Sequence, residues 1–212
     1  MQATRIIAIR HGETAWNVDT RIQGQLDIEL NDTGLWQAQR VAQALSEESV
    51  AAIYASDLSR AFQTASAIGH VLGLQPVPTP ALRERHFGEF QTRTWAEIES
   101  TWPDQAKLWR QREPEWAPQG GESLITLHQR ISQCVNQLAQ AHMGQQMVLV
   151  AHGGIMDVLY RWGTGQTLQA PRTWSLGNAV INRVLWTPQG LTLVGWGDDR
   201  HLQNASRDEI SA

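Results

Sequence analysis

Two short apolar runs, each ending in a histidine followed by glycine, constrain the fold of this 212-residue chain more than any other feature. The first run, Ile6–Ile9, leads directly into Arg10-His11-Gly12-Glu13-Thr14, and the second, Met147–Ala151, leads into His152-Gly153-Gly154. An abrupt change from β-branched residues to charged residues and glycine is typical of a buried strand that opens into a loop. Both histidines are therefore predicted to follow the carboxyl ends of buried strands.

In an open α/β sheet, ligands bind beyond the carboxyl ends of the strands, so we expect the two imidazoles to meet at one sheet edge. Arg10 offers a fork of donors that matches a phosphate, and His11 offers a ring nitrogen that is largely neutral near pH 7. Gly12 is expected to let the backbone approach a ligand closely, because it has no Cβ. Taken alone, the 10–14 segment is equally compatible with a surface turn.

Two more segments lie between these junctions: Ser-Asp-Leu-Ser-Arg-Ala at 56–61, after a short strand over 51–55, and Leu-Arg-Glu-Arg-His-Phe-Gly-Glu at 82–89. With R-H-G-E-T before them and A-H-G-G after them, the chain resembles the histidine phosphatase superfamily, also called phosphoglycerate-mutase-like. The resemblance extends from residue 5 to about residue 182. Each motif alone would be weak, but four motifs in the family's order are specific.

Predicted strands alternate with predicted helices along the chain, which favours a three-layer α/β/α sandwich with a mostly parallel central sheet. We expect one domain over 1–212, with a small helical lid insertion at about 92–118 and a frayed C-terminal tail at about 202–212. An extended connection is expected over 76–80, a long helix over 123–141, and a helix from about residue 155. The stretches 179–187 and 191–196 flank Pro188-Gln189-Gly190 and predict a hairpin.

Composition excludes several classes of protein. The net charge of -4 provides no basic footprint, so neither nucleic acid nor an anionic membrane is an expected partner. No apolar stretch is long enough to span a bilayer, and no signal peptide precedes the first strand. The single cysteine, Cys134, cannot form an internal disulfide and falls on the apolar side of a predicted helix, so we expect a cytoplasmic protein with Cys134 in its core. The oligomeric state stays open.

The helix that starts near residue 32 is expected to have Asp32 or Thr33 as its N-cap. Its buried face is predicted from helical spacing, and the same spacing predicts the next helix, which ends at Gly73. The predicted buried residues of the first helix are Leu35, Ala38, Val41, Ala42 and Leu45.

Tryptophan recurs at Trp95, Trp102, Trp109 and Trp116, inside the predicted lid. Two short helices are expected there, with Thr94 and Thr101 near their starts. The four rings are expected to form the lid's own core, because large aromatic residues mainly pack. The alternative is that they line an acceptor site for a substrate with an apolar or ring-containing body.

The resemblance implies a role for each candidate site residue. It implies that His11 attacks phosphorus and forms a phosphohistidine, with its other ring nitrogen donating to a backbone carbonyl. It further implies that Arg10 and Arg60 grip the phosphate, that His152 and Asn17 stabilise its oxygens, and that Glu84 is the general acid and base. Gln23, Gly24 and Gly153 complete the expected substrate-binding residues.

Some of these residues are also compatible with a purely structural role. Glu84 lies between Arg83 and Arg85 and is also compatible with a surface ion pair. Glu13 is expected to support its loop, and Asn178 is compatible with either a site contact or a turn. No Walker loop and no H-x-H or H-E-x-x-H pair occurs, so neither a metal nor another cofactor is expected.

Three functions fit these residues. The first is a metal-independent hydrolase of a small phosphomonoester, which we favour. The second is a cofactor-dependent phosphoglycerate mutase that uses the same phosphohistidine step. The glycolytic mutases have a tyrosine where Phe87 stands, an asparagine where Gly154 stands, and a longer insertion with paired arginines, whereas Arg110 and Arg112 are separated here. The third is a phospho-ligand binding module without turnover.

Overall fold

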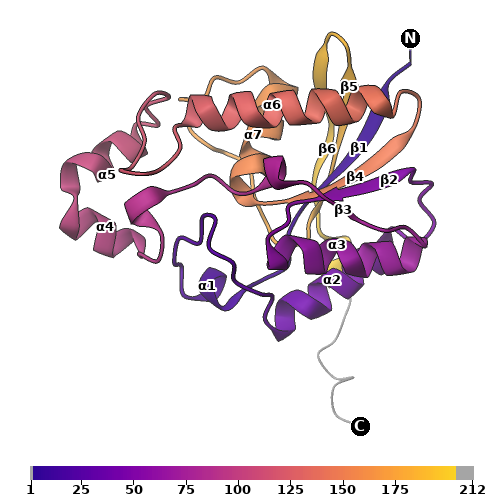
Figure 1. Ribbon diagram of the computed structural model, residues 1–212, viewed down its shortest axis with the longest axis horizontal. Helices are drawn as coiled ribbons and strands as arrows, with labels where there is room; N and C mark the ends of the chain where they lie inside the picture. The colour runs from indigo at the N-terminus through magenta and orange to yellow at the C-terminus, as the bar shows by residue number, and fades with distance from the viewer. Residues whose placement is uncertain (1, 204–212) are drawn as a thin grey trace.

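Six strands form one sheet between two layers of helices in the computed structural model, which describes residues 2–203 (Figure 1). The order across the sheet is β3-β2-β4-β1-β5-β6. The pairs β3–β2, β2–β4 and β4–β1 are parallel, whereas β5 pairs antiparallel with β1 and with β6. The predicted α/β/α class is confirmed, with a mixed sheet. The strands are β1 (Thr4–Arg10), β2 (Ala52–Ala55), β3 (Val77–Pro78), β4 (Gln146–Ala151), β5 (Ile181–Thr187) and β6 (Gly190–Asp198).

The helices α2 and α3 cover one face of the sheet, and α6 and α7 cover the other (Figure 1). The one-turn helix α1 and two 3₁₀ helices, η1 and η2, lie in the connections, and a second one-turn helix, α8, follows the last strand. The helices are α1 (Ala15–Val18), α2 (Asp32–Ala44), α3 (Ser59–Leu72), η1 (Pro80–Leu82), η2 (Gly88–Phe90), α4 (Trp95–Thr101), α5 (Pro103–Arg110), α6 (Leu124–Ala141), α7 (Gly153–Thr164) and α8 (Arg200–Gln203).

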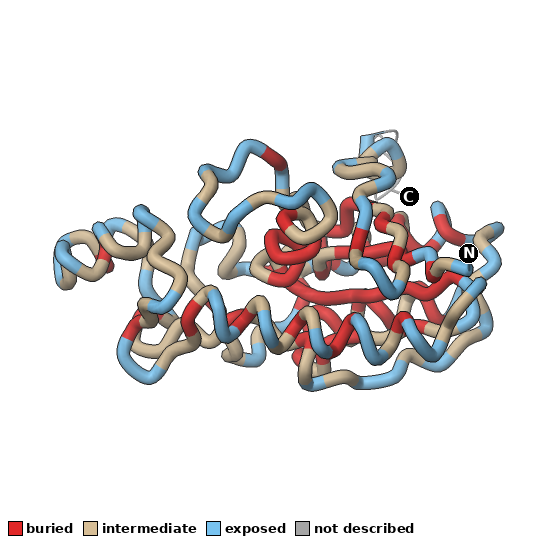
Figure 2. Tube along the Cα trace, turned by 90° about the horizontal axis from the view of Figure 1, so that it is seen from above, coloured by how far each residue is buried: buried red, intermediate tan, exposed pale blue. Residues whose placement is uncertain are grey.

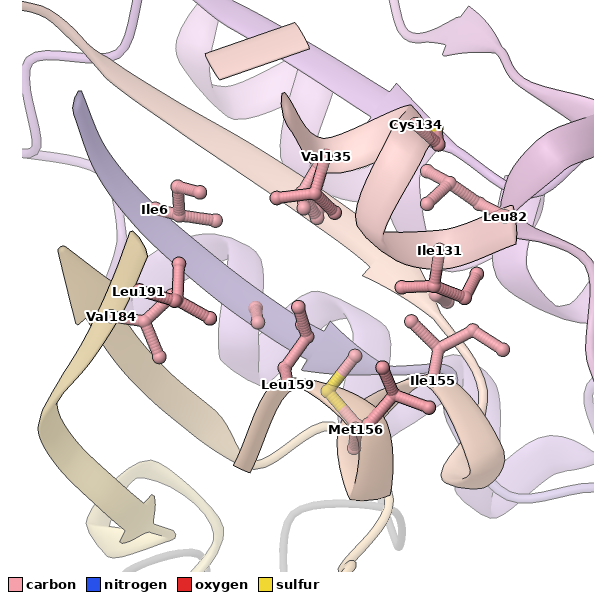
Figure 3. Packing of buried hydrophobic residues seen from close by; sticks show 14 of the residues in the cluster. Ile6, Leu82, Ile131, Cys134, Val135, Ile155, Met156, Leu159, Val184 and Leu191 are labelled. Atoms are coloured by element: carbon pink, nitrogen blue, oxygen red, sulfur yellow. The ribbon is translucent and has the colours of Figure 1, made fainter. Parts of the chain in front are cut away.

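The central strands are buried on both faces because alternate side chains enter different cores. Ile7 and Ile9 of β1 pack with α2 and α3, whereas Ile6 and Ala8 pack with α6 and α7. All six residues of β4 are buried, as expected for a parallel strand covered by helices on both sides. Figure 2 shows the buried sheet between more exposed layers, and Figure 3 shows side chains of α6 and α7 pointing towards β1 and the β5–β6 hairpin.

The N-cap of α2 differs from the prediction. Asn31 has extended backbone angles and its side chain accepts the backbone N–H of Gly34, so it caps the helix in place of Asp32 or Thr33. Leu35 was predicted to be buried but is 44% exposed, because it follows the cap on the solvent side of the first turn. The other four predicted core positions of this helix are buried.

Most other predicted elements are confirmed. The long helix α6 has the expected length, and Ser123 is its N-cap. Gly73 ends α3 in the left-handed conformation, and β5 and β6 form the predicted hairpin. The expected extended connection contains a two-residue edge strand, β3. The helix expected from about residue 155 begins at Gly153 instead, because His152 already has the extended backbone of an N-cap. Most of the predicted C-terminal tail lies outside the described residues.

The segment that contains α4 and α5 projects from one end of the sheet (Figure 1, left). Thr94 caps α4 as predicted, but Thr101 is its last residue and α5 starts after Trp102. Phe90 is completely buried among the tryptophans, with ring centroids 5.6 Å from Trp102 and 5.9 Å from both Trp109 and Trp116. The prediction that the tryptophans form the core of this segment is confirmed.

No helix within residues 2–203 is both long enough and apolar enough to span a membrane.

Candidate active site

The two histidines meet because β1 and β4 are parallel neighbours that end at the same edge of the sheet. Arg10 is in register with Ala151, and the backbone N–H of His11 donates to the carbonyl of Ala151 at 3.0 Å. The rings of His11 and His152 then lie with centroids 5.2 Å apart and planes tilted by 60°. The predicted meeting of the two imidazoles is therefore confirmed.

His11 is held in one tautomer. Its Nδ1 lies 2.7 Å from the carbonyl oxygen of Gly12, which can only accept, so Nδ1 carries the proton and Nε2 keeps its lone pair. Burial lowers the pKa of His11 well below its ordinary value, and the positive charges of Arg10 and Arg60 lower it further. His11 is therefore neutral near pH 7.

His152 is also buried and neutral. Its Nε2 lies 2.8 Å from the hydroxyl of Ser56, and its Nδ1 has no hydrogen-bond partner among the described residues. Burial lowers the pKa of His152 well below its ordinary value, and the positive charges of Arg60 and Arg10 lower it further. The orphaned Nδ1 is available to a ligand atom, because a buried polar atom rarely stays unpaired.

Two arginines approach this edge from different elements. Arg10 ends β1, and its Nη1 donates to the carbonyl of Leu176. Arg60, in the first turn of α3, is 1% exposed and donates to the carbonyls of Leu26 and Gly24 at 2.8 and 2.7 Å. Burial lowers the pKa of Arg60 to about 10 and also lowers the pKa of Arg10. Because a guanidinium group is protonated at neutral pH in proteins, both side chains supply positive charge. The Nε atoms of both are buried without a partner among the described residues.

A cavity of about 160 Å³, here called the inner cavity, brings most of the predicted site residues together. His152 is not part of its lining, although its ring adjoins His11. Arg21 and Phe87 line the cavity but were not predicted as site residues. Arg21 begins the 21–24 segment, which also supplies Gln23 and Gly24, and Phe87 belongs to the 82–89 motif. The lining residues are Arg10, His11, Asn17, Arg21, Ile22, Gln23, Gly24, Arg60, Glu84 and Phe87.

Two asparagines near His11 make different contacts. The Oδ1 of Asn17 accepts the N–H of Thr14 at 3.1 Å in a capping box at α1, which leaves the Asn17 amide group as a donor at the inner cavity. Asn178 donates to the carbonyl of His11 at 2.8 Å, so it supports the His11 backbone. Glu13 accepts from Asn31 at 2.9 Å and supports its loop, as expected.

Gly12 lies in close contact with α2. A Cβ at Gly12 would lie 2.5 Å from the carbonyl oxygen of Gly34, so the glycine is required for the loop to pack against α2. The expected close approach of a ligand to Gly12 stays a prediction. The contact with Gly34 joins residues 22 positions apart, so local pattern does not reveal it.

Glu84 is not part of a surface ion pair. Its carboxylate accepts the backbone N–H of Gly154 at 3.0 and 3.2 Å and that of Arg85 at 2.7 Å. Arg83 pairs instead with Asp57, and the Arg85 side chain donates to the carbonyls of Glu122 and Trp116. Glu84 is therefore held at the first turn of α7 by backbone N–H groups.

Gly154 permits this docking. A Cβ at Gly154 would lie 2.3 Å from Oε1 of Glu84, much closer than any real Cβ contact. A Cβ at Gly153 would meet Arg10 and Glu84 at 3.7 to 3.9 Å, which is ordinary contact. Like Arg21 and Phe87, Ser56 and Gly154 were not identified from the sequence as site residues, although both stand inside quoted motifs.

A larger cavity of about 530 Å³, here called the outer cavity, adjoins the inner one. Arg10, Glu84 and Phe87 line both, and Gly153 lines only the outer cavity. Within residues 2–203, no three histidine, cysteine, aspartate or glutamate side chains gather in a way that would hold a metal ion. Where the two cavities meet, the neutral imidazole of His11, the guanidinium groups of Arg10 and Arg60, and the carboxyl group of Glu84 form an arrangement suited to a phosphate group and its ester oxygen.

Comparisons with known proteins agree with this geometry. Residues 6–199 match the model of the histidine phosphatase superfamily, branch 1. The chain is 37% identical to "Phosphoglycerate mutase-like protein 4" of Arabidopsis thaliana, over 93% of this chain and 86% of that protein. It is 35% identical to "Metal-independent phosphoserine phosphatase" of the same plant, over 96% and 85%. A solved structure of a mycobacterial glucosyl-3-phosphoglycerate phosphatase with VO3 has a TM-score of 0.81 and 33% identity, covering 92% of this chain and 99% of the other.

Proposed function

Because this chain belongs to the histidine phosphatase superfamily and is an enzyme of that family, we propose that it hydrolyses a small phosphomonoester through a phosphohistidine, without a metal ion. The observation that carries the proposal is the state of His11. It is neutral, its Nε2 is unprotonated, and it lines one small cavity together with two guanidinium groups and Glu84. Relatives named for phosphoserine and glucosyl-3-phosphoglycerate support a small phosphorylated substrate.

In the first step, Nε2 of His11 attacks phosphorus and the bond to the ester oxygen breaks. Glu84, in its protonated form, gives its proton to the departing oxygen, so that an alcohol leaves and a carboxylate remains. Arg10 and Arg60 hold the phosphoryl oxygens and neutralise their charge, which is the task of a metal ion in other phosphoryl-transfer enzymes.

In the second step, the Glu84 carboxylate takes a proton from a water molecule, whose oxygen attacks phosphorus as the bond to Nε2 breaks. Inorganic phosphate leaves, and His11 is again neutral with Glu84 protonated. Asn17 and His152 donate to the phosphoryl oxygens in both steps. His152 does so as a neutral ring through its orphaned Nδ1, because its lowered pKa disfavours the cation.

Trapping the intermediate tests this assignment. Glu84→Gln removes the proton donor and the base, but p-nitrophenyl phosphate has a good leaving group and needs little protonation. The variant should therefore be phosphorylated on His11 and should hydrolyse the phosphoenzyme slowly, which mass spectrometry of quenched protein detects. His11→Ala, with the same fold and no nucleophile, should carry no label. A label on His152 or on a carboxylate would refute the assignment of His11.

The mutase alternative shares the first step and differs in the acceptor. With 3-phosphoglycerate and no bisphosphorylated primer, a hydrolase releases phosphate in step with substrate loss. Faster isomerisation than phosphate release would establish a mutase, and tight binding without either product would establish a binding module.

A further inference from the structure

The outer cavity has an excess of positive charge beyond the arginine that it shares with the inner cavity. Its lining includes Arg10, which also lines the inner cavity, and three further arginines, Arg85, Arg112 and Arg172. The only carboxylates in that lining are Glu84 and Asp157. A recess of about 460 Å³ beside it is lined by the same three arginines, with Trp109 and Arg110.

Neither carboxylate neutralises the three arginines. Glu84 accepts backbone N–H groups, as described above. Oδ2 of Asp157 is shared by Arg112 at 2.7 Å and Arg161 at 2.9 Å, so a single carboxylate faces two guanidinium groups. The pair with Asp157 therefore leaves a net positive charge on this wall of the cavity.

Two of the three arginines are fixed in place. Arg85 is 5% exposed, donates to the carbonyl of Glu122 at 2.7 Å, and its guanidinium lies 4.8 Å from the Trp109 ring centroid. Arg112 donates to the carbonyl of Leu168 at 2.7 Å as well as to Asp157, on a residue with the unusual φ of +53°. A preorganised cationic wall binds an anion at a low entropic cost.

Arg172 is the third, and it is unpaired: no carboxylate lies within ion-pair distance of it in residues 2–203. Arg172 lines the outer cavity together with Arg10 and Arg112, and its positive charge contributes to lowering the pKa of both. An exposed arginine beside other arginines is repelled by them, which a bound anion would relieve.

We propose that the outer cavity binds a second anionic group, on the leaving-group side of the substrate, through Arg172 and Arg112 with Arg85 behind them. The substrate class is then a small phosphomonoester that also carries a carboxylate or a second phosphate. This inference rests on the proposed function, because that function places the leaving group in the outer cavity.

Matched substrate pairs test it. 3-Phosphoglycerate and glycerol 3-phosphate differ by the carboxylate, and fructose 1,6-bisphosphate and fructose 6-phosphate differ by the second phosphate. The wild-type enzyme should prefer the more anionic member of at least one pair by about tenfold or more in kcat/KM, and the preferred pair identifies the anion. Arg172→Gln should reduce that preference by about tenfold.

Arg110→Gln is the matched control. Arg110 also lines the recess, but it pairs with Glu99 and its guanidinium lies 5.3 Å from the Trp95 ring centroid, so the preference should persist in this variant. No preference in either pair, or an Arg172→Gln preference equal to that of the wild type, would overturn the proposal.

Calorimetric binding of the same pairs to His11→Ala repeats the comparison without turnover. A preference seen in binding but lost in Arg172→Gln/His11→Ala supports the anion site even if the hydrolase proposal fails. Equal binding of both members of each pair refutes the anion site, whatever the catalytic result.

Discussion

The hydroxyl of Ser56 lies 2.8 Å from Nε2 of His152, and both residues are completely buried. The same hydroxyl accepts the backbone N–H of Leu58 at 3.3 Å, which leaves its own proton for the imidazole. With Nε2 as the acceptor, the neutral ring must carry its proton on Nδ1, the atom without a partner. Ser56 thereby prepares His152 to donate.

Replacing Ser56 should impair catalysis through this tautomer. Ser56→Ala leaves Nε2 without its donor, so the ring can adopt the other tautomer, and we expect kcat to fall by about tenfold or more. Nitrogen NMR of the His152 ring should show Nδ1 protonated in the wild type and a mixture in the variant. Ser66→Ala, which removes an exposed hydroxyl on α3, should change neither. Unchanged kcat and ring spectrum in Ser56→Ala would contradict this role.

Gly154→Ala should displace Glu84, because the new methyl group would lie 2.3 Å from Oε1. Loss of a positioned general acid costs about 10²- to 10⁴-fold, so kcat for alkyl phosphates should fall within that range. The loss should be much smaller for p-nitrophenyl phosphate, which needs little protonation. Gly153→Ala, with contacts of 3.7 Å or more, should lose far less. Equal losses in the two variants would contradict the contact.

Acid should destabilise the fold through the two buried histidines. Their folded pKa values lie well below 6.5, so on acidification the unfolded chain takes up these protons first. Their contribution to the free energy of unfolding is therefore complete above pH 6.5 and falls below it, by about 1.4 kcal/mol per pH unit for each ring. Urea denaturation between pH 7.5 and 5.5 measures this slope. His152→Gln should show a shallower slope, and an equal slope would contradict the assignment.

Activity should persist in excess EDTA, because Arg10, Arg60 and His152 supply the donors that a metal ion would otherwise provide. Phosphate release before and after dialysis against the chelator is the measurement. Loss of turnover that Mg²⁺ or Zn²⁺ restores would contradict metal independence.

Asn31→Ala should lower the free energy of unfolding by about 1 kcal/mol, because Asn31 caps α2. Thr33→Ala, at an exposed residue beside the cap, should change it by less than about 0.5 kcal/mol. Urea denaturation at pH 7.5 compares the two, and a larger effect at Thr33 would restore the original prediction of the cap.

Local pattern was enough to predict the layers of this fold and the edge at which the candidate site lies. Ile6–Ile9 reads as a buried strand whichever neighbours it has, and a histidine after such a strand must emerge at its carboxyl end. The helix over residues 124–141 and the β5–β6 hairpin were predicted for the same reason, since hydrophobic period and turn residues act over a few positions.

Contacts between distant residues were decided only by the tertiary structure. The pairing of β1 with β4 brings His11 beside His152, the docking of Glu84 depends on Gly154 seventy positions away, and Ser56 meets His152 across two strands. The unpaired charge of Arg172 likewise depends on which groups the fold places around it. Such contacts leave no local periodicity, because their geometry depends on strand order and on side-chain packing among elements far apart in the chain.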